Sequence, residues 1–176
     1  MSKLKNTFTL TTAAMLLALG IILGMLKIPI NQFIEIRFGS LPISIGGALF
    51  GPGVAAAIGA LSDIGGYLVK PTGPFFPGFT ISGLISGLIF GFFFYKKTLT
   101  WTRILAAEVV NTVVVNLLLN TYWLMTLYGT TTYMPLLISR LPKEIILTPV
   151  MTVIMVAVMK AMEQFGLRAA VAEKAH

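Results

Sequence analysis

The stretch "GPGVAAAIGALSDIGGYLVKPTGPFFPGFTISGLISGLIFGFFFYKK", Gly51–Lys97, decides the fold of this chain. It holds two long apolar runs joined by a proline-rich connection, and its charged residues before the closing Lys96-Lys97 are Asp63 and Lys70. A helix needs about 20 mostly apolar residues to cross the hydrocarbon core of a membrane. The stretch therefore predicts two membrane-spanning helices joined by a short, stiff loop.

The rest of the chain continues this pattern. Only 11% of the 176 residues are charged and 56% are hydrophobic, whereas soluble domains carry about 25% charged residues. Charge-free runs of spanning length cover Asn6–Leu26, Phe38–Ser62, Pro71–Tyr95 and Val109–Ser139. The first run is longer than the apolar core of a cleavable signal peptide, so we expect it to remain as a helix. The sequence predicts an all-α, polytopic membrane protein.

Proline and glycine divide these runs into six helices. Gly51-Pro52-Gly53 should end one helix and begin the next, which leaves the second helix short. Pro142 is tolerated in a first helical turn and Pro149 should kink the last helix. We expect one transmembrane domain over residues 1–176, with long connections after helices 1, 3 and 5 and with helices at about 8–25, 42–50, 53–69, 78–94, 100–124 and 142–164.

The distribution of Lys and Arg predicts the orientation. With six helices both termini lie on one side, and eight of the 13 Lys and Arg residues fall on that side. The positive-inside rule then makes both termini cytoplasmic in a multi-pass plasma-membrane protein. The net charge of +7 is explained by this rule and does not call for a nucleic-acid partner. The long connections face outward, where we expect a site built by loops.

Several kinds of chemistry are excluded by composition. Cysteine is absent and the one histidine is His176, so thiolate and histidine metal sites and Cys-His or Ser-His pairs are not expected. No phosphate-binding loop of the Gly-x-x-x-x-Gly-Lys-Ser/Thr type occurs. We expect no metal, no cofactor, no catalytic constellation and no ATP hydrolysis by this chain.

Asp63 is a candidate binding residue because a carboxylate inside a membrane helix is costly unless it is paired or hydrated. A structural partner such as Lys70, two turns away, is the alternative. The predicted fifth helix carries a polar stripe at steps of four, which keeps one slowly drifting face. Its inner members, Glu108 and Asn111, are interpreted as interhelical contacts. Asn116 and Asn120 are interpreted as lining a pocket.

Cations and aromatic side chains gather at the predicted outer ends. In "SRLPKE", Ser139–Glu144, Arg140 offers a planar fork suited to carboxylates, and Lys143 lies beside it; snorkelling to the membrane surface is the alternative. Phe75, Tyr122 and Trp123 either belong to an aromatic belt or stack on a flat ring. Prolines three residues apart favour an extended path, which predicts that residues 70–78 form a stiff cover.

These motifs resemble the substrate-binding S components of energy-coupling factor (ECF) vitamin transporters, and among them the folate group. Residues Arg37–Gly91 carry the resemblance, with "SRLPKE" and the Ala-x-x-x-Ala pattern of Ala14 and Ala18 in support. The resemblance implies a six-helix bundle that binds one vitamin in an outward cavity. It also implies a transmembrane coupling subunit that docks on Ala14 and Ala18, and two ATPase subunits.

For folate as the ligand, the resemblance and the residue chemistry together leave several assignments open. The pterin would form hydrogen bonds with Asp63 or Asn120. The glutamate tail would be held by Arg37, Lys70, Arg140 or Lys143. An S component for another vitamin is the nearest alternative. A small intramembrane enzyme using Asp63, Glu108 or Glu144, and a structural assembly factor, are alternatives from other classes.

Overall fold

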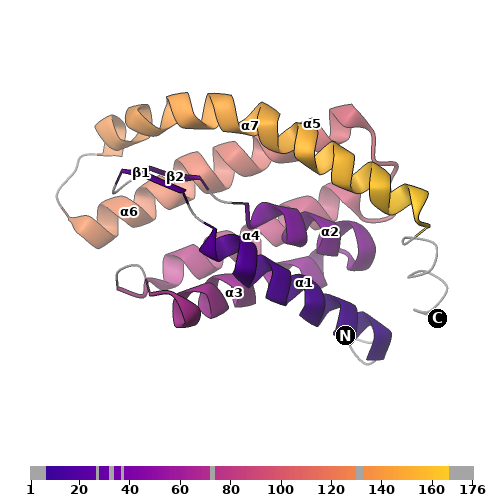
Figure 1. The fold of residues 1–176 in the computed structure, drawn as a ribbon. Helices are drawn as coiled ribbons and strands as arrows, with labels where there is room; N and C mark the ends of the chain where they lie inside the picture. The colour runs from indigo at the N-terminus through magenta and orange to yellow at the C-terminus, as the bar shows by residue number, and fades with distance from the viewer. Residues whose placement is uncertain are drawn as a thin grey trace.

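The computed structural model of the chain describes residues 7–26, 28–31, 34–36, 38–71, 74–129 and 133–166. Within them six helices follow one another as predicted (Figure 1), the second of them short. The helical elements are α1 (Thr7–Met25), α2 (Ser40–Phe50), α3 (Pro52–Val69), α4 (Pro77–Phe94), the continuous helix formed by α5 (Trp101–Asn111), η2 (Thr112–Leu119) and α6 (Asn120–Tyr128), and α7 (Tyr133–Gln164).

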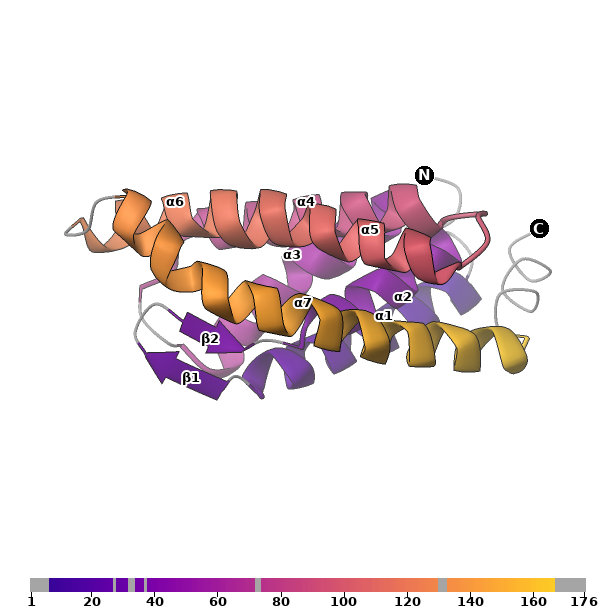
Figure 2. The same cartoon turned by 90° about the horizontal axis from the view of Figure 1, so that it is seen from above.

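Five of these helices are long and apolar enough to cross a membrane, and α2 is shorter. Figures 1 and 2 show them running roughly along one axis. α1 begins and α7 ends at one end of the bundle, which we call the terminal end. α3 ends, and α4 and α7 begin, at the opposite end, which we call the loop end. Large hydrophobic side chains such as Leu19, Phe92 and Ile146 are exposed on the outside, as expected for contact with lipid.

The break between α2 and α3 is made by Gly51 and Pro52, as the sequence predicts. Gly51 has φ +94°, a conformation that side-chain-bearing residues rarely adopt. Pro52 occupies the first turn of α3, where the missing N–H costs nothing. The chain therefore reverses within one residue, and α2 stays short.

α3 and α4 pack closely because glycines face each other across their contact. A Cβ atom on Gly59 would meet the backbone of Gly83, and a Cβ atom on Gly87 would meet the backbone of Ala55. Small residues allow helix backbones to approach in this way. α3 and α4 therefore form one closely packed side of the bundle.

The centre of the predicted fifth helix is a π-helix, η2, which the sequence did not indicate. In an α-helix a step of four residues drifts by about 40° per step. The wider turn of a π-helix, closed by i to i+5 hydrogen bonds, counteracts this drift. The polar stripe therefore stays on one face from Glu108 to Asn120.

The last helix begins earlier than predicted. The expected start near Pro142 is wrong, because α7 begins at Tyr133 and continues through Pro142 and Pro149. Prolines are tolerated inside membrane helices, since neighbouring groups satisfy the backbone atoms that they free. Figure 2 shows α7 changing direction in its first part. The predicted connection over residues 126–139 is thus mostly helical.

The connection after α1 contains a short β-hairpin that was not predicted. β1 (Ile28–Asn31) and β2 (Ile34–Ile36) pair antiparallel, with Ile28 opposite Ile36 and an irregularity between Pro29 and Asn31. In Figure 1 the hairpin lies near the loop end, and β2 contacts α7. It adds two strands to a protein that is otherwise helical in the described residues.

The hydrophobic core fills the half of the bundle nearer the terminal end. Phe90, Phe94, Ile104, Met155 and Met159 are almost completely buried there, and the rings of Phe90 and Phe94 stack with centroids 5.7 Å apart. The half nearer the loop end is not filled in this way, and it holds the cavity described next.

Candidate ligand-binding cavity

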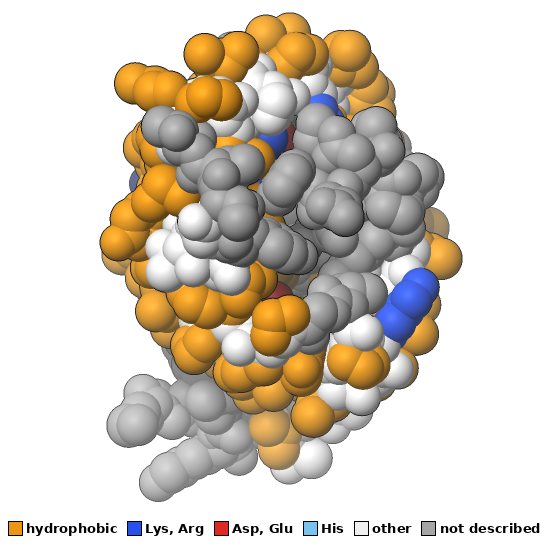
Figure 3. All heavy atoms as spheres, turned by 90° about the vertical axis from the view of Figure 1, so that its left-hand side faces the viewer, with side chains coloured by type: hydrophobic (Ala, Val, Ile, Leu, Met, Phe, Trp, Pro, Cys, Tyr) orange, Lys and Arg blue, Asp and Glu red, His pale blue; other side chains and the backbone are white. Residues whose placement is uncertain are grey.

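A cavity of about 260 Å³ lies among the helices and is lined by residues from all six of them. Ligand pockets in proteins commonly measure about 300–1,000 Å³, so this one is at the small end. Viewed from the loop end, Figure 3 shows charged side-chain atoms set back between hydrophobic ones. A polar, charged interior inside an apolar exterior marks a binding site in a membrane protein.

One wall of the cavity is a polar ladder between η2 and α7. The hydroxyls of Thr112 and Thr148 are 3.1 Å apart, and Asn116 donates through Nδ2 to Oε2 of Glu144 at 3.3 Å. The helices run antiparallel, so the next step of four towards the loop end leads to Asn120 and Arg140. Asn116, Asn120 and Arg140 all line the cavity.

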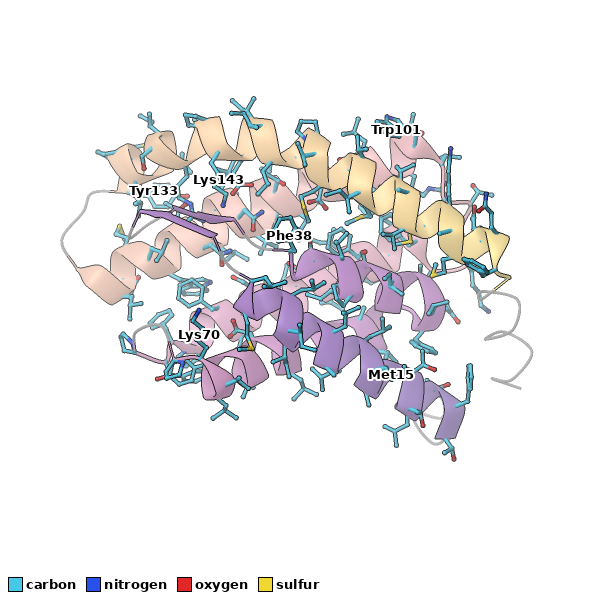
Figure 4. All side chains as sticks on the ribbon, in the orientation of Figure 1. Met15, Phe38, Lys70, Trp101, Tyr133 and Lys143 are labelled. Carbon is cyan, nitrogen blue, oxygen red and sulfur yellow. The ribbon has the colours of Figure 1, made fainter. Side chains whose placement is uncertain are left out.

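Charged side chains line the cavity at several depths. Arg140 and Lys143 line it in the first turns of α7, and Figure 4 shows Lys143 pointing from α7 into the bundle. Arg140 is only 6% exposed, and Nζ of Lys143 lies 2.9 Å from Oε1 of Glu144. Glu108 lines the cavity nearer the terminal end. Both cations of the cavity therefore lie towards the loop end, where Glu144 and Asp63 also line it, and Glu108 lies further in.

Asp63 lines the opposite wall. Its Oδ2 accepts a hydrogen bond from Oγ1 of Thr80 at 2.9 Å, which ties α3 to α4. The partner is thus Thr80 on the next helix rather than Lys70. Oδ1 has no hydrogen bond among the described residues and stays available as an acceptor.

Aromatic side chains lie at the loop end of the cavity. Phe75, Phe76 and Tyr67 line it, and the rings of Tyr67 and Phe75 are 5.2 Å apart. The ring of Phe76 lies 5.7 Å from that of Trp123, whose Nε1–H donates to Oγ of Ser82 at 3.1 Å. The predicted cover over residues 70–78 therefore touches α6 through Phe76 in the part that the structure describes.

The other predicted site residues lie elsewhere. Lys70 and Tyr122 are exposed and do not line the cavity, and Trp123 packs behind the lining residues Phe76 and Ser82. Arg37 lies outside the described residues. Of the four cations given as alternatives for the glutamate tail, Arg140 and Lys143 are the ones that line the described cavity.

Several lining residues were missed or were interpreted differently from the sequence. Phe79, Ser86 and Thr148 gave no signal that separates them from ordinary membrane-helix residues. Glu108 and Asn111, interpreted above as interhelical contacts, both line the cavity. Their position on the polar stripe was the signal, and the π-helix is what keeps the whole stripe facing the cavity.

Ala14 and Ala18 are both exposed on α1, away from the cavity. Ala13, Leu16 and Gly20 are the buried side of the same helix. The small-residue pattern therefore faces outward from the bundle, where another helix can approach.

The cavity has the chemistry of a binding site. Among the described residues no group of acidic or histidine side chains could hold a metal ion. Hydrogen-bonding groups, two cations, three carboxylates and aromatic rings line one space, which suits a ligand that carries a flat ring with hydrogen-bond donors and an anionic end. The fold and cavity define a polytopic membrane protein that binds such a ligand.

Comparison with known proteins identifies the family. Residues 8–159 match the family described as "ECF transporter, substrate-specific component", and the chain belongs to this family. It is 37% identical over 81% of its length, and 83% of the relative's, to "Folate transporter FolT" of Clostridium novyi (strain NT). It is 30% identical to the protein of the same name from Leuconostoc mesenteroides, over 78% of this chain and 76% of that one.

Solved structures agree with this assignment. The chain superposes with a TM-score of 0.78 and 30% identity on the structure titled "Crystal structure of FolT bound with folic acid", over 85% of this chain and 90% of that one. A second, titled "Structure and mechanism of the S component of a bacterial ECF transporter", has a TM-score of 0.70 at 21% identity over 89% and 96%, and it supports the fold. The family consists of transporter components, which agrees with a role other than catalysis.

Proposed function

We propose that this protein is the folate-specific S component of an ECF transporter, which binds folate in the cavity and delivers it across the membrane. The similarity to a FolT structure with folic acid bound, over 85% of the chain, carries this proposal. The position of both cavity cations, Arg140 and Lys143, towards the loop end supports it, because folate has an anionic glutamate at one end and an uncharged pterin at the other.

The proposed contacts follow from this polarity. Arg140 and Lys143 hold the glutamate carboxylates, since a guanidinium binds a carboxylate through two parallel hydrogen bonds. Phe75 and Phe76 cover the ligand at the loop end. Asn116 and Asn120 hydrogen-bond the middle of the ligand. Asp63 offers one further acceptor from the opposite wall.

The transport step requires partners that this chain does not contain. By analogy with the family, a transmembrane coupling subunit docks on Ala14 and Ala18, and two ATPase subunits supply the energy. Both termini are cytoplasmic, which puts the loop end and its cavity outside the cell. The exposure of Ala14 and Ala18 and the excess of Lys and Arg on the terminal side support this arrangement.

The experiment is a titration of the purified protein with folate, followed by tryptophan fluorescence. Trp123 contacts Phe76 at the cavity, whereas Trp101 is half-exposed at the terminal end. Folate should quench the fluorescence of the wild-type protein and of Trp101→Phe, but not that of Trp123→Phe. Another S-component vitamin that binds while micromolar folate does not would refute the substrate assignment.

A further inference from the structure

The inner part of the cavity carries two polar side chains to which the proposed contacts give no role, Glu108 and Asn111. Both line the cavity, and each is only 4% exposed. Oε2 of Glu108 and Oδ1 of Asn111 have no hydrogen-bond partner among the described residues. Buried acceptors without donors cost free energy, so a ligand that supplies the donors explains both at once.

The two side chains lie next to each other. They are three residues apart on α5, and such residues are neighbours on one helix face. Both precede η2. Glu108 lies one step of four inward from Thr112, which pairs with Thr148, and Asn111 is the residue just before Thr112. Val115 and Met151 also line the cavity and supply apolar surface. This part of the cavity is therefore suited to a flat group with N–H donors along one edge.

The charge of Glu108 decides which end of the ligand lies here. A second carboxylate at this depth would repel it at low dielectric. The cavity-lining cations, Arg140 and Lys143, lie towards the loop end, about three steps of the stripe away, which is on the order of 15 Å. The anionic end of a bound ligand must therefore lie outward, and its uncharged, donor-bearing end inward.

We propose that Glu108 and Asn111 recognise the 2-amino-4-oxopyrimidine edge of the pterin. The carboxylate of Glu108 accepts from N3–H and from one hydrogen of the 2-amino group. Oδ1 of Asn111 accepts the other amino hydrogen, and its Nδ2 donates to N1. In folate, adjacent N–H donors along one edge occur only at this pyrimidine edge, so Glu108 and Asn111 select for a ligand that carries it. This assignment rests on the proposed function, and it differs from the expectation from the sequence that Asp63 or Asn120 binds the pterin.

The test compares Glu108→Gln with the wild-type chain by calorimetric titration of the purified protein. The variant keeps the size of the side chain and replaces one acceptor oxygen by a donor. Folate should bind roughly 10- to 100-fold more weakly, since hydrogen bonds to a charged group are lost. A folate analogue without the 2-amino group should bind the wild-type protein more weakly than folate does. The Glu108→Gln substitution should weaken the binding of this analogue by less than about threefold.

Glu163→Gln is the matched control, because it makes the same change at an exposed glutamate near the end of α7 and should leave both affinities unchanged. Asn111→Ala is a second variant for the same subsite and should weaken folate binding about tenfold. Folate binding by Glu108→Gln and Asn111→Ala at wild-type affinity would overturn the assignment while leaving folate as the substrate. Failure of the wild-type protein to bind folate would overturn both.

Discussion

Replacement of Arg140 by alanine tests the proposed glutamate contact most directly. Arg140 lines the cavity and is 6% exposed, so its bonds to a carboxylate form away from bulk water. Truncation of one partner of such a buried charge pair costs about 2–4 kcal/mol. At 1.4 kcal/mol per tenfold, folate should bind roughly 30- to 700-fold more weakly.

Pteroate, which lacks the glutamate, should be affected much less. We expect Arg140→Ala to change its affinity by no more than about threefold, since the contacts to the rings remain. Calorimetric titration of both ligands measures the difference. Arg103→Ala is the control, because Arg103 is half-buried at the terminal end, does not line the cavity and donates to the backbone oxygen of Thr98 at 3.0 Å. Equal losses for folate and pteroate would show that Arg140 acts through the fold and would refute the reasoning.

Three further predictions concern docking, packing and topology. Ala14→Trp should abolish folate uptake with the partner subunits present and leave binding by the isolated chain intact. Ala157→Trp, also exposed but on α7, should leave both uptake and binding intact; impaired binding by Ala14→Trp would contradict the docking role. Gly59→Ala should lower the melting temperature, since overpacking against Gly83 costs about 1–3 kcal/mol. Gly53→Ala should not lower it, because the added Cβ atom meets open space; equal melting temperatures for the two variants would count against the close packing of α3 and α4. Because the chain has no cysteine, Lys70→Cys should react with an impermeant thiol reagent on intact cells and Lys97→Cys should not; the reverse pattern would invert the topology.

The sequence predicted the bundle because apolar run lengths and glycine-proline breaks are local signals. Gly51 and Pro52 determine the α2–α3 turn by their own geometry. The start of α7 was missed because Pro142 fits a first turn in isolation, and only neighbouring helices allow a proline inside a membrane helix. The hairpin after α1 was missed for a related reason, since Ile28–Ile36 is short and carries a proline.

The site was predicted less completely because side-chain direction depends on packing. Asp63, Asn116, Asn120, Arg140 and Lys143 line the cavity as expected. Lys70 and Tyr122 are on the same end of the bundle but do not line the cavity. Lys70 directly follows α3, where helical periodicity gives no guide, and Tyr122 lies on α6, two residues from Asn120 and so on another face. Glu108 was interpreted as an interhelical contact because it lies near the inner end of a polar stripe and such stripes commonly form hydrogen bonds between membrane helices, and the open cavity beside it is a tertiary feature.

The π-helix η2 has a consequence for how relatives of this protein can diverge. A π-helical turn arises when one residue is inserted into an α-helix. Deletion of that residue would restore the regular turn and leave the phase of the rest of the helix unchanged. In a relative that keeps the same number of residues but forms a regular α-helix here, the rest of that helix would be rotated by about 100° relative to α5. Asn120 would then leave the cavity although it had not itself changed. Ligand preference along this wall can thus evolve by a shift of helical phase, with every lining residue retained in the sequence.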